Sequence, residues 1–133
     1  MVTITGEYQG SLHCVAKHGP SGMELVTDAP KDNQGKGEAF SPTDLVATAF
    51  ATCVCTIMAM AARTRGVDLA GMTYTVSKEM SAQPPRRIAK LHLKLVLPPA
   101  AQAIPREILE RAAHTCPVHQ SLAPDIEKVI EMV

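Results

Sequence analysis

The sequence has no tryptophan, and only two phenylalanines and two tyrosines are present among its 133 residues. A hydrophobic core must therefore be built from aliphatic side chains and from methionine, which occurs seven times. A small chain whose core is this poor in large rings often gains buried area from a partner chain. The composition therefore favours a protein that pairs with a second copy of itself.

The sequence also lacks a net charge, because 13 Lys and Arg residues balance 13 Asp and Glu residues. No long-range field then attracts polyanions, which argues against nucleic acid and anionic membranes as partners. The first residues show no basic start, apolar stretch and small-residue cleavage site of a secretory signal. We therefore expect a cytoplasmic protein with a single domain over residues 1–133, whose four cysteines are mainly reduced.

One long uncharged stretch is present, the 18 residues from 45 to 62. This length is close to the lower limit for crossing a bilayer. Much of the stretch is Ala and Thr, which gain little from lipid, and no second apolar segment accompanies it. A helix that is apolar on nearly all sides is more simply explained by burial in a protein core. The sequence therefore predicts a long buried helix and no membrane span.

The start of this helix is marked by a capping sequence. Ser41 can cap the helix, Pro42 suits the first helical position, and Asp44 can reach back to the backbone of the cap. At the other end, Arg63 and Arg65 place positive charge near the negative end of the helix dipole. The pattern predicts a helix that begins directly after Ser41.

The remaining segments alternate between strand and helix patterns, which predicts an α+β fold. Leucines alternate with other residues from 91 to 97, as in a strand with one buried face, and Pro105 opens a second helix. The segment 126–133 fits either a closing edge strand or a continued helix. The other expected elements are hairpin arms at 7–17 and 23–27 around a turn at 18–22, a loop at 28–40, and strands at 72–80 and 88–97 separated by two prolines.

Two cysteines stand in unlike surroundings. Cys53 lies inside the uncharged helix, so we expect a buried thiol, whereas Cys116 is followed by Pro117 at a helix boundary. A redox centre of two thiols requires a thiolate that is oxidised and a second thiol that can join it in a disulfide. At a helix N-cap, Cys116 would have a lowered pKa, whereas burial would raise the pKa of Cys53. These two thiols make redox chemistry at sulfur the leading hypothesis.

Two separated motifs carry a resemblance to a known family. The segment from Ser41 to Leu45, followed by Ala51-Thr52-Cys53, and the later segment Cys116-Pro117-Val118-His119-Gln120-Ser121-Leu122 resemble the OsmC/Ohr family. The resemblance implies an α+β OsmC-like fold, with an antiparallel sheet, a long buried central helix and a second helix, in an intertwined homodimer. It further implies reduction of organic hydroperoxides, with Cys53 as the attacking thiol and Cys116 as the resolving thiol. An external dithiol would then restore the protein, and neither a cofactor nor a metal would be needed.

The sequence departs from the Ohr branch of that family at two positions. Ohr enzymes carry a glutamate directly after the proline at the helix start and an arginine in the N-terminal region. This sequence has Thr43 at the glutamate position and no arginine before Arg63. Thr43, Asp44 and His119 are the candidates for supporting residues, although capping already explains Asp44. The candidate substitutes for the arginine are Lys17, His18, Lys31 and Lys36.

Other functions remain open from the residues alone. His114, Cys116 and His119 form a His-x-Cys-x-x-His cluster, which could bind zinc or copper with Cys53 as a fourth ligand. A role as a proton donor would suit either histidine. A third possibility is a protein that binds a hydrophobic small molecule at a dimer interface without thiol chemistry. We expect Cys14 and Cys55 to have structural roles, with Cys55 turned away from Cys53 on the helix.

Overall fold

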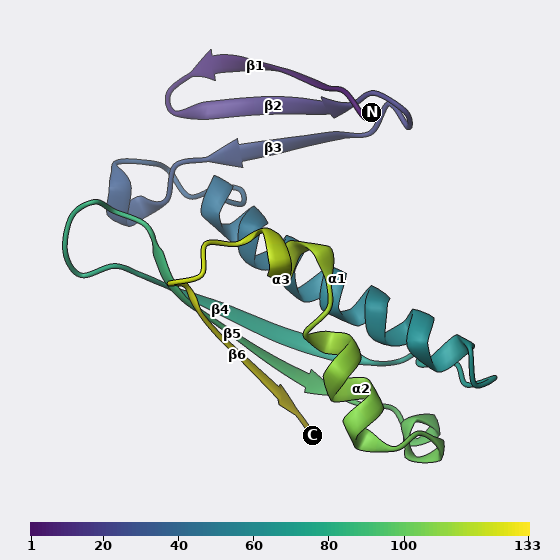
Figure 1. The fold of residues 1–133 in the computed structure, drawn as a ribbon. Coiled ribbons are helices and arrows are strands. Elements are labelled where there is room, and N and C mark those ends of the chain that lie inside the picture. The colour runs from purple at the N-terminus through teal and green to yellow at the C-terminus, as the bar shows by residue number, and fades with distance from the viewer. The chain divides into compact units, whose positions relative to one another are not determined.

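The computed structural model describes residues 1–133 and divides into two compact units, Met1–Val46 and Ala47–Val133. The first unit holds a three-stranded sheet, and the second holds another three-stranded sheet and most of the helical residues (Figure 1). The expectation of a single domain over the whole chain stays a prediction. Each unit is described by itself below.

The N-terminal unit is an antiparallel sheet of three strands, β1 (Ile4–Gly10), β2 (His13–His18) and β3 (Glu24–Asp28), in that order. The predicted turn between β2 and β3 is confirmed, since the Gly22 N–H donates to the His18 carbonyl at 2.8 Å. The predicted single strand over residues 7–17 is wrong. A turn divides it, in which Ser11 and Leu12 adopt φ angles of 53° and 60°. Residues other than glycine rarely adopt this left-handed conformation, so the sequence carried little signal for the turn.

One face of this sheet is largely apolar and exposed. The strand register places Tyr8 directly opposite Cys14, and Ala16 directly opposite Leu25, and residues opposite each other share a face. Tyr8 and Leu25 are 62% and 47% exposed, and Ile4 on the same face is 65% exposed. The single chain therefore leaves a contiguous apolar sheet face available for contact with other protein.

The predicted capping sequence is confirmed at the start of α1 (Pro42–Arg63). The Asp44 N–H donates to the Ser41 hydroxyl oxygen at 3.1 Å, and the Ser41 N–H donates to the Asp44 carboxylate at 2.8 Å. Each side chain thus satisfies a backbone N–H that has no partner within the helix. Ser41 is only 1% exposed, so water cannot replace these hydrogen bonds.

Replacing Ser41 with alanine should lower the free energy of unfolding by about 1 kcal/mol or somewhat more, because it removes the cap from a buried helix start. Urea unfolding followed by circular dichroism, at one fixed protein concentration, measures this change. Ser77→Ala on β4 is a matched control, since Ser77 is exposed. A loss for Ser41→Ala no larger than the loss for the control would contradict the capping role.

The C-terminal unit contains β4 (Thr73–Met80), β5 (Ile88–Val96) and β6 (Glu127–Met132), in the order β4-β5-β6. The leucine alternation is confirmed, since Leu91, Leu93 and Leu95 are completely buried. The last segment is an edge strand, so the alternative of a continued helix is wrong. β6 pairs with β5 in parallel, which the sequence did not predict. This pairing is possible because helices connect the two strands and return the chain to the other end of the sheet.

Three α-helices complete the fold: α1, α2 (Arg106–Ala113) and α3 (Pro117–Ser121). Figure 1 shows α2, α3 and most of α1 on one side of the sheet β4-β5-β6. By length and composition α1 could cross a bilayer, but Phe50, Val54 and Met58 are completely buried in the protein. Their spacing of four residues places them along one helix face, which makes α1 a core helix. Two short 3-10 helices, Lys31–Asn33 and Pro99–Ala103, lie in the connections.

Candidate functional site

The two cysteines selected from the sequence meet in the C-terminal unit. Cys53 lies on α1, and Cys116 is the N-cap residue of α3. The two side chains interact, since Cys53 raises the pKa of the Cys116 thiol, and neither cysteine is in a disulfide. The tertiary structure thus brings together two sulfur atoms that are distant in the sequence.

Cys116 is completely buried and has the predicted N-cap geometry. Its sulfur accepts a hydrogen bond from the His119 backbone N–H at 3.2 Å. Burial nevertheless raises the pKa of the Cys116 thiol, and the neighbouring Cys53 thiol raises it further, whereas the His119 N–H lowers it. The expected lowering of this pKa is therefore wrong, because the cost of placing a thiolate in an apolar interior exceeds the stabilisation by the helix start.

Cys53 is the more accessible of the two thiols. It is partly exposed in the single chain, whereas Cys116 has no exposed area. Within the single chain Cys53 is less buried than expected, because the face of α1 that packs in the core is the neighbouring one, and its burial against a partner chain stays a prediction. Phe50 and Ile57 lie three residues before and four residues after Cys53, and helix geometry places them beside it. The thiol is therefore flanked by apolar side chains and open on one side.

His119 lies beside the two thiols and is partly buried. Its ring is 6.0 Å from the Phe50 ring and 5.5 Å from the His114 ring, which it meets edge to face. Burial lowers the pKa of His119, and electrostatic interactions with Lys128 and His114 lower it further. The imidazole is consequently neutral at neutral pH. A role of the His119 side chain as a proton donor stays a prediction. The hydrogen bond from His119 to the Cys116 sulfur comes from the backbone N–H.

Thr43 and Asp44 occupy the first turn of α1 and belong to the cap of that helix. The Thr43 hydroxyl oxygen lies 3.1 Å from the Ser41 hydroxyl oxygen. Ten residues of α-helix, the separation between Thr43 and Cys53, span about 15 Å. Thr43 and Asp44 are therefore too far along α1 to reach the Cys53 thiol of the same chain. Of the four candidate cations, Lys17, Lys31 and Lys36 are exposed, and the His18 Nδ1 lies 2.6 Å from the Ser21 hydroxyl oxygen.

The other two cysteines differ from each other. Cys55 is partly buried on α1, and burial raises the pKa of its thiol, which agrees with a packing role. Cys14 on β2 is exposed, so the expected structural role has no support within the single chain. Neither Cys14 nor Cys55 forms a hydrogen bond or an ion pair with a side chain of the candidate site.

A hydrogen bond between His13 and the buried Asp28 in the N-terminal unit was not predicted from the sequence. Asp28 is 5% exposed, and its carboxylate lies 2.5 Å from the His13 Nδ1 and accepts the Glu38 N–H at 3.0 Å. The hydrogen bond from His13 is the main cause that lowers the pKa of Asp28. These contacts hold the loop before α1 against the sheet. Finding the pair would have required the strand register, which places His13 opposite Asp28.

The metal alternative has no geometric support. Among residues 1–133, no group of three or more His, Cys, Asp or Glu side chains is arranged to hold a metal ion. The cluster of His114, Cys116 and His119 therefore does not converge on one point, which a metal requires.

Three cavities in the C-terminal unit, of about 340 to 470 Å³, are lined by residues other than Cys53 and Cys116. The most apolar of them lies beside the segment from Leu97 to Ile104. None of these three cavities therefore gives a single chain a binding site for a hydrophobic ligand at the two thiols. A binding site at a dimer interface stays a prediction.

The comparisons with known proteins agree with the fold and with the motifs. Residues 35–131 match the model of the family described as OsmC-like protein. This chain therefore belongs to the OsmC-like family. None of the curated proteins matches the sequence.

A crystal structure from Psychrobacter arcticus 273-4, of a protein named for osmotic stress induction and a detoxification response, is 43% identical to this chain. The similarity covers 100% of this chain and 96% of the other, with a TM-score of 0.89. An organic hydroperoxide resistance protein OsmC from Legionella pneumophila has a TM-score of 0.79 at 16% identity, over 99% of this chain and 96% of the other. One from Vibrio cholerae, with captopril bound in an active site, has a TM-score of 0.74 at 23% identity, over 99% and 90%. The predicted α+β OsmC-like fold is confirmed.

Proposed function

We propose that this protein reduces organic hydroperoxides as part of a defence against oxidative stress, with Cys53 as the attacking thiol and Cys116 as the resolving thiol. The observation that carries the proposal is that Cys53 on α1 and Cys116 at the start of α3 lie close enough to interact, although they are 63 positions apart in the sequence. Membership of the OsmC-like family and the names of the similar structures support the wider role in stress defence.

The first step is attack of the Cys53 thiolate on the terminal oxygen of ROOH. A sulfur–oxygen bond forms and the oxygen–oxygen bond breaks, so sulfur loses two electrons and the alkoxide leaves. The alkoxide takes up a proton to give the alcohol ROH, and Cys53 becomes a sulfenic acid. Partial exposure of Cys53 supports its assignment as the attacking thiol, since the peroxide must reach it.

The second step is condensation of Cys116 with the sulfenic acid. The Cys116 sulfur attacks the Cys53 sulfur, a disulfide bond forms, the sulfur–oxygen bond breaks, and water leaves with the thiol proton. Burial of Cys116 protects this thiol from direct oxidation, while contact with Cys53 allows it to react as soon as the sulfenic acid exists. The same contact limits further oxidation of Cys53 to the sulfinic acid.

The surroundings of Cys53 favour an organic peroxide over hydrogen peroxide. Phe50 and Ile57 flank the thiol on its helix face, and apolar side chains bind the alkyl part of a substrate by removing it from water. A substrate with a larger alkyl or aryl group therefore gains more binding energy. Hydrogen peroxide has no such group.

A homodimer is part of the proposal. The exposed apolar face of the sheet β1-β2-β3 is best covered by a second copy of the chain, in agreement with the small aromatic content. The partner copy would also enclose the open side of Cys53. An external dithiol would reduce the disulfide after each turnover in a cytoplasmic setting, without a bound cofactor.

One equivalent of cumene hydroperoxide, added to the reduced protein, should convert Cys53 and Cys116 into a disulfide and leave Cys14 and Cys55 as thiols. Alkylation of the remaining thiols followed by peptide mass spectrometry maps each sulfur. Loss of free thiol in a different pair, or no loss at all, would contradict the proposed site. If cumene hydroperoxide raised the melting temperature without any loss of free thiols, the result would instead support a protein that binds the compound without reducing it.

A further inference from the structure

The segment between β3 and α1, residues 29–40, is a compact loop whose two ends meet. The Asp28 N–H donates to the Phe40 carbonyl at 3.1 Å, which brings the chain back beside the end of β3. Inside the loop, the Gly35 N–H donates to the Pro30 carbonyl at 3.0 Å. Loops of this length with close ends are packed by their own atoms and frequently have a function. We call residues 29–40 the strap.

The closed form of the strap depends on a close backbone approach at Gly35. A Cβ atom at this position would lie 1.6 Å from the Ala29 carbonyl oxygen, so no residue with a side chain fits. The same carbonyl accepts the Gly37 N–H at 3.3 Å. The strap therefore has one defined closed conformation, which a single methyl group at position 35 would block.

Asp28 joins the far end of the strap to the sheet β1-β2-β3. Its Oδ2 accepts the Glu38 N–H at 3.0 Å, and its Oδ1 lies 2.5 Å from the His13 Nδ1. The register of β2 and β3 places His13 directly opposite Asp28, so the two side chains extend from the same face of the sheet. We call the contact between His13 and Asp28 the clasp.

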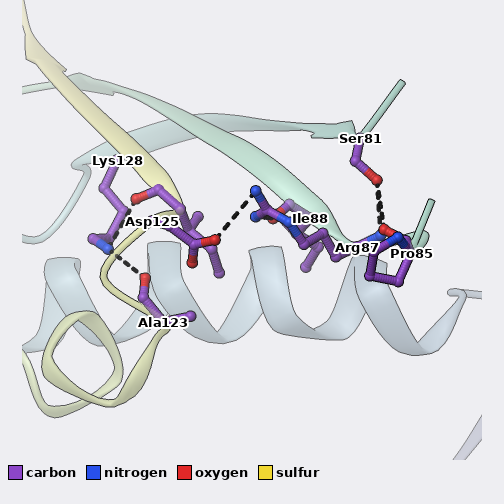
Figure 2. A network of polar contacts seen from close by, with 8 residues as sticks. Ser81, Pro85, Arg87, Ile88, Ala123, Asp125 and Lys128 are labelled. Atoms are coloured by element: carbon purple, nitrogen blue, oxygen red, sulfur yellow. Dashed lines mark hydrogen bonds and ion pairs between the residues drawn. The ribbon is translucent and has the colours of Figure 1, made fainter. Parts of the chain in front are cut away.

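The clasp is more protected from water than the ion pairs on the surface of the protein. The Asp28 side chain is 6% exposed, whereas the pair of Arg87 and Asp125 shown in Figure 2 joins side chains that are 44% and 63% exposed. Exposed pairs contribute little because water and salt screen them. A buried carboxylate that loses its partner is costly, so removal of His13 should be felt by every group that Asp28 holds.

The charge of Asp28 is maintained by groups from both the sheet and the strap. The hydrogen bond from His13 on β2 is the largest cause that lowers the pKa of Asp28, and the Glu38 N–H and Lys36 of the strap lower it further, although burial raises it. The carboxylate therefore stays ionised at pH values where an ordinary aspartate becomes protonated. Its stabilising contribution is complete above the usual pKa and is lost as the pH falls through the lowered pKa.

We propose that the strap opens and closes as a unit while the sheet stays folded, and that the clasp between His13 and ionised Asp28 keeps it closed. Most strap residues are exposed, and segments with few buried contacts open at low cost. Opening releases the backbone groups of Glu38 and Phe40, directly before the buried cap residue Ser41, so the clasp governs how the chain enters α1. This device goes beyond the proposed function and does not depend on it.

The test is amide hydrogen exchange followed by NMR on the full-length protein. The reporters are the strap amides that donate hydrogen bonds, those of Asn33, Gly35, Gly37 and Glu38. Corrected for their intrinsic rates, they should exchange at similar rates, because one opening exposes all of them, and faster than the paired amides of β2. His13→Ala should raise the strap rates about tenfold, the size expected for one hydrogen bond to a charged group.

His18→Ala is the matched control, because His18 is a second histidine of β2 and its Nδ1 contacts the Ser21 hydroxyl oxygen, outside the strap. The control should leave the strap rates unchanged. Equal strap rates in His13→Ala and His18→Ala would show that the clasp does not hold the strap, and the inference would be overturned.

The pH dependence separates the clasp from a merely structural contact. In the unchanged protein, the corrected strap rates should rise as the pH falls through the lowered pKa of Asp28. In His13→Ala the rise should begin at a higher pH, because loss of the hydrogen bond raises the pKa of Asp28. Asp28→Asn should exchange rapidly throughout and show no such rise. A rise that persists in Asp28→Asn would assign the effect to another group and contradict the clasp.

Gly35→Ala tests whether the strap is a separate unit, because it blocks the closed form and leaves the clasp residues in place. The strap amides should lose their protection while the amides of β2 and β3 keep theirs. Loss of protection in the sheet as well would overturn the proposal of a strap that opens by itself. Should His13→Ala fail to fold, the comparison of Asp28→Asn with the unchanged protein decides the role of the clasp on the same readouts.

Discussion

Replacing Cys53 with serine should abolish hydroperoxide reduction, with a fall in turnover on the order of a thousandfold or more. A serine hydroxyl has almost the shape of the thiol but is not ionised at neutral pH and is not oxidised by peroxides, so the first step has no nucleophile. Consumption of cumene hydroperoxide in the presence of excess dithiol measures this loss. The fold should persist, because Cys53 is only partly buried and the substitution changes one atom.

Cys55→Ser is the matched control for that experiment. Cys55 lies two positions further along the same helix and is also partly buried, but its side chain is turned about 200° away from that of Cys53. Activity of Cys55→Ser and of Cys14→Ser should stay within about threefold of the unchanged protein, since neither thiol takes part. Full activity of Cys53→Ser, or a loss in Cys55→Ser as large as in Cys53→Ser, would overturn the assigned mechanism.

Replacing Cys116 with serine should allow one reduction of hydroperoxide and then stop turnover. Cys53 can still attack and release the alcohol, but no second thiol lies beside the sulfenic acid to form the disulfide. With one equivalent of peroxide, the variant should consume nearly all of it within the first turnover, and dimedone should then label Cys53. With excess peroxide, the sulfenic acid should advance to the sulfinic acid, which thiols do not reduce.

The control for Cys116→Ser is a comparison with Cys116→Ala. Serine can still accept the His119 N–H at the N-cap, whereas alanine cannot, so only the alanine variant should also lose stability, by about 1 kcal/mol. Both should stall after one reduction, because both lack the sulfur. Sustained turnover by either variant with a dithiol would show that the reductant acts directly on Cys53, and Cys116 would lose its assigned role.

The parts of the fold that follow from the sequence are those with local signals. The cap at Ser41 and Asp44 depends on residues three positions apart, and the alternating leucines of β5 depend on neighbours two apart. The hydrogen bonds of a helix cap and the two-residue period of a strand are local properties of the backbone, so both leave a signal in the sequence. The family was also recognised in this way, from motifs at the start of α1 and around Cys116 that the family model confirms over residues 35–131.

The parts that sequence reasoning missed depend on distant groups. The turn at Ser11 and Leu12 uses residues that rarely adopt left-handed angles, and the parallel pairing of β5 with β6 is decided by where two helices return the chain. The complete burial of Cys116 was not predicted, and Cys53 is less buried in the single chain than expected, because a sequence does not show which face of an apolar helix meets the core. The pKa of Cys116 is raised, whereas the sequence predicted that it is lowered, because the sequence does not show that this thiol is completely buried.

The sequence by itself determined that this chain has an α+β OsmC-like fold and which two cysteines to examine, because capping residues, strand periodicity and the motifs around the thiols act over a few positions. Only the tertiary structure decided that Cys53 and Cys116 interact with each other and that Cys116 is the protected thiol. The physical reason is that burial and electrostatic interactions depend on distances in space, and folding brings α1, α3 and β6 together from separate parts of the chain.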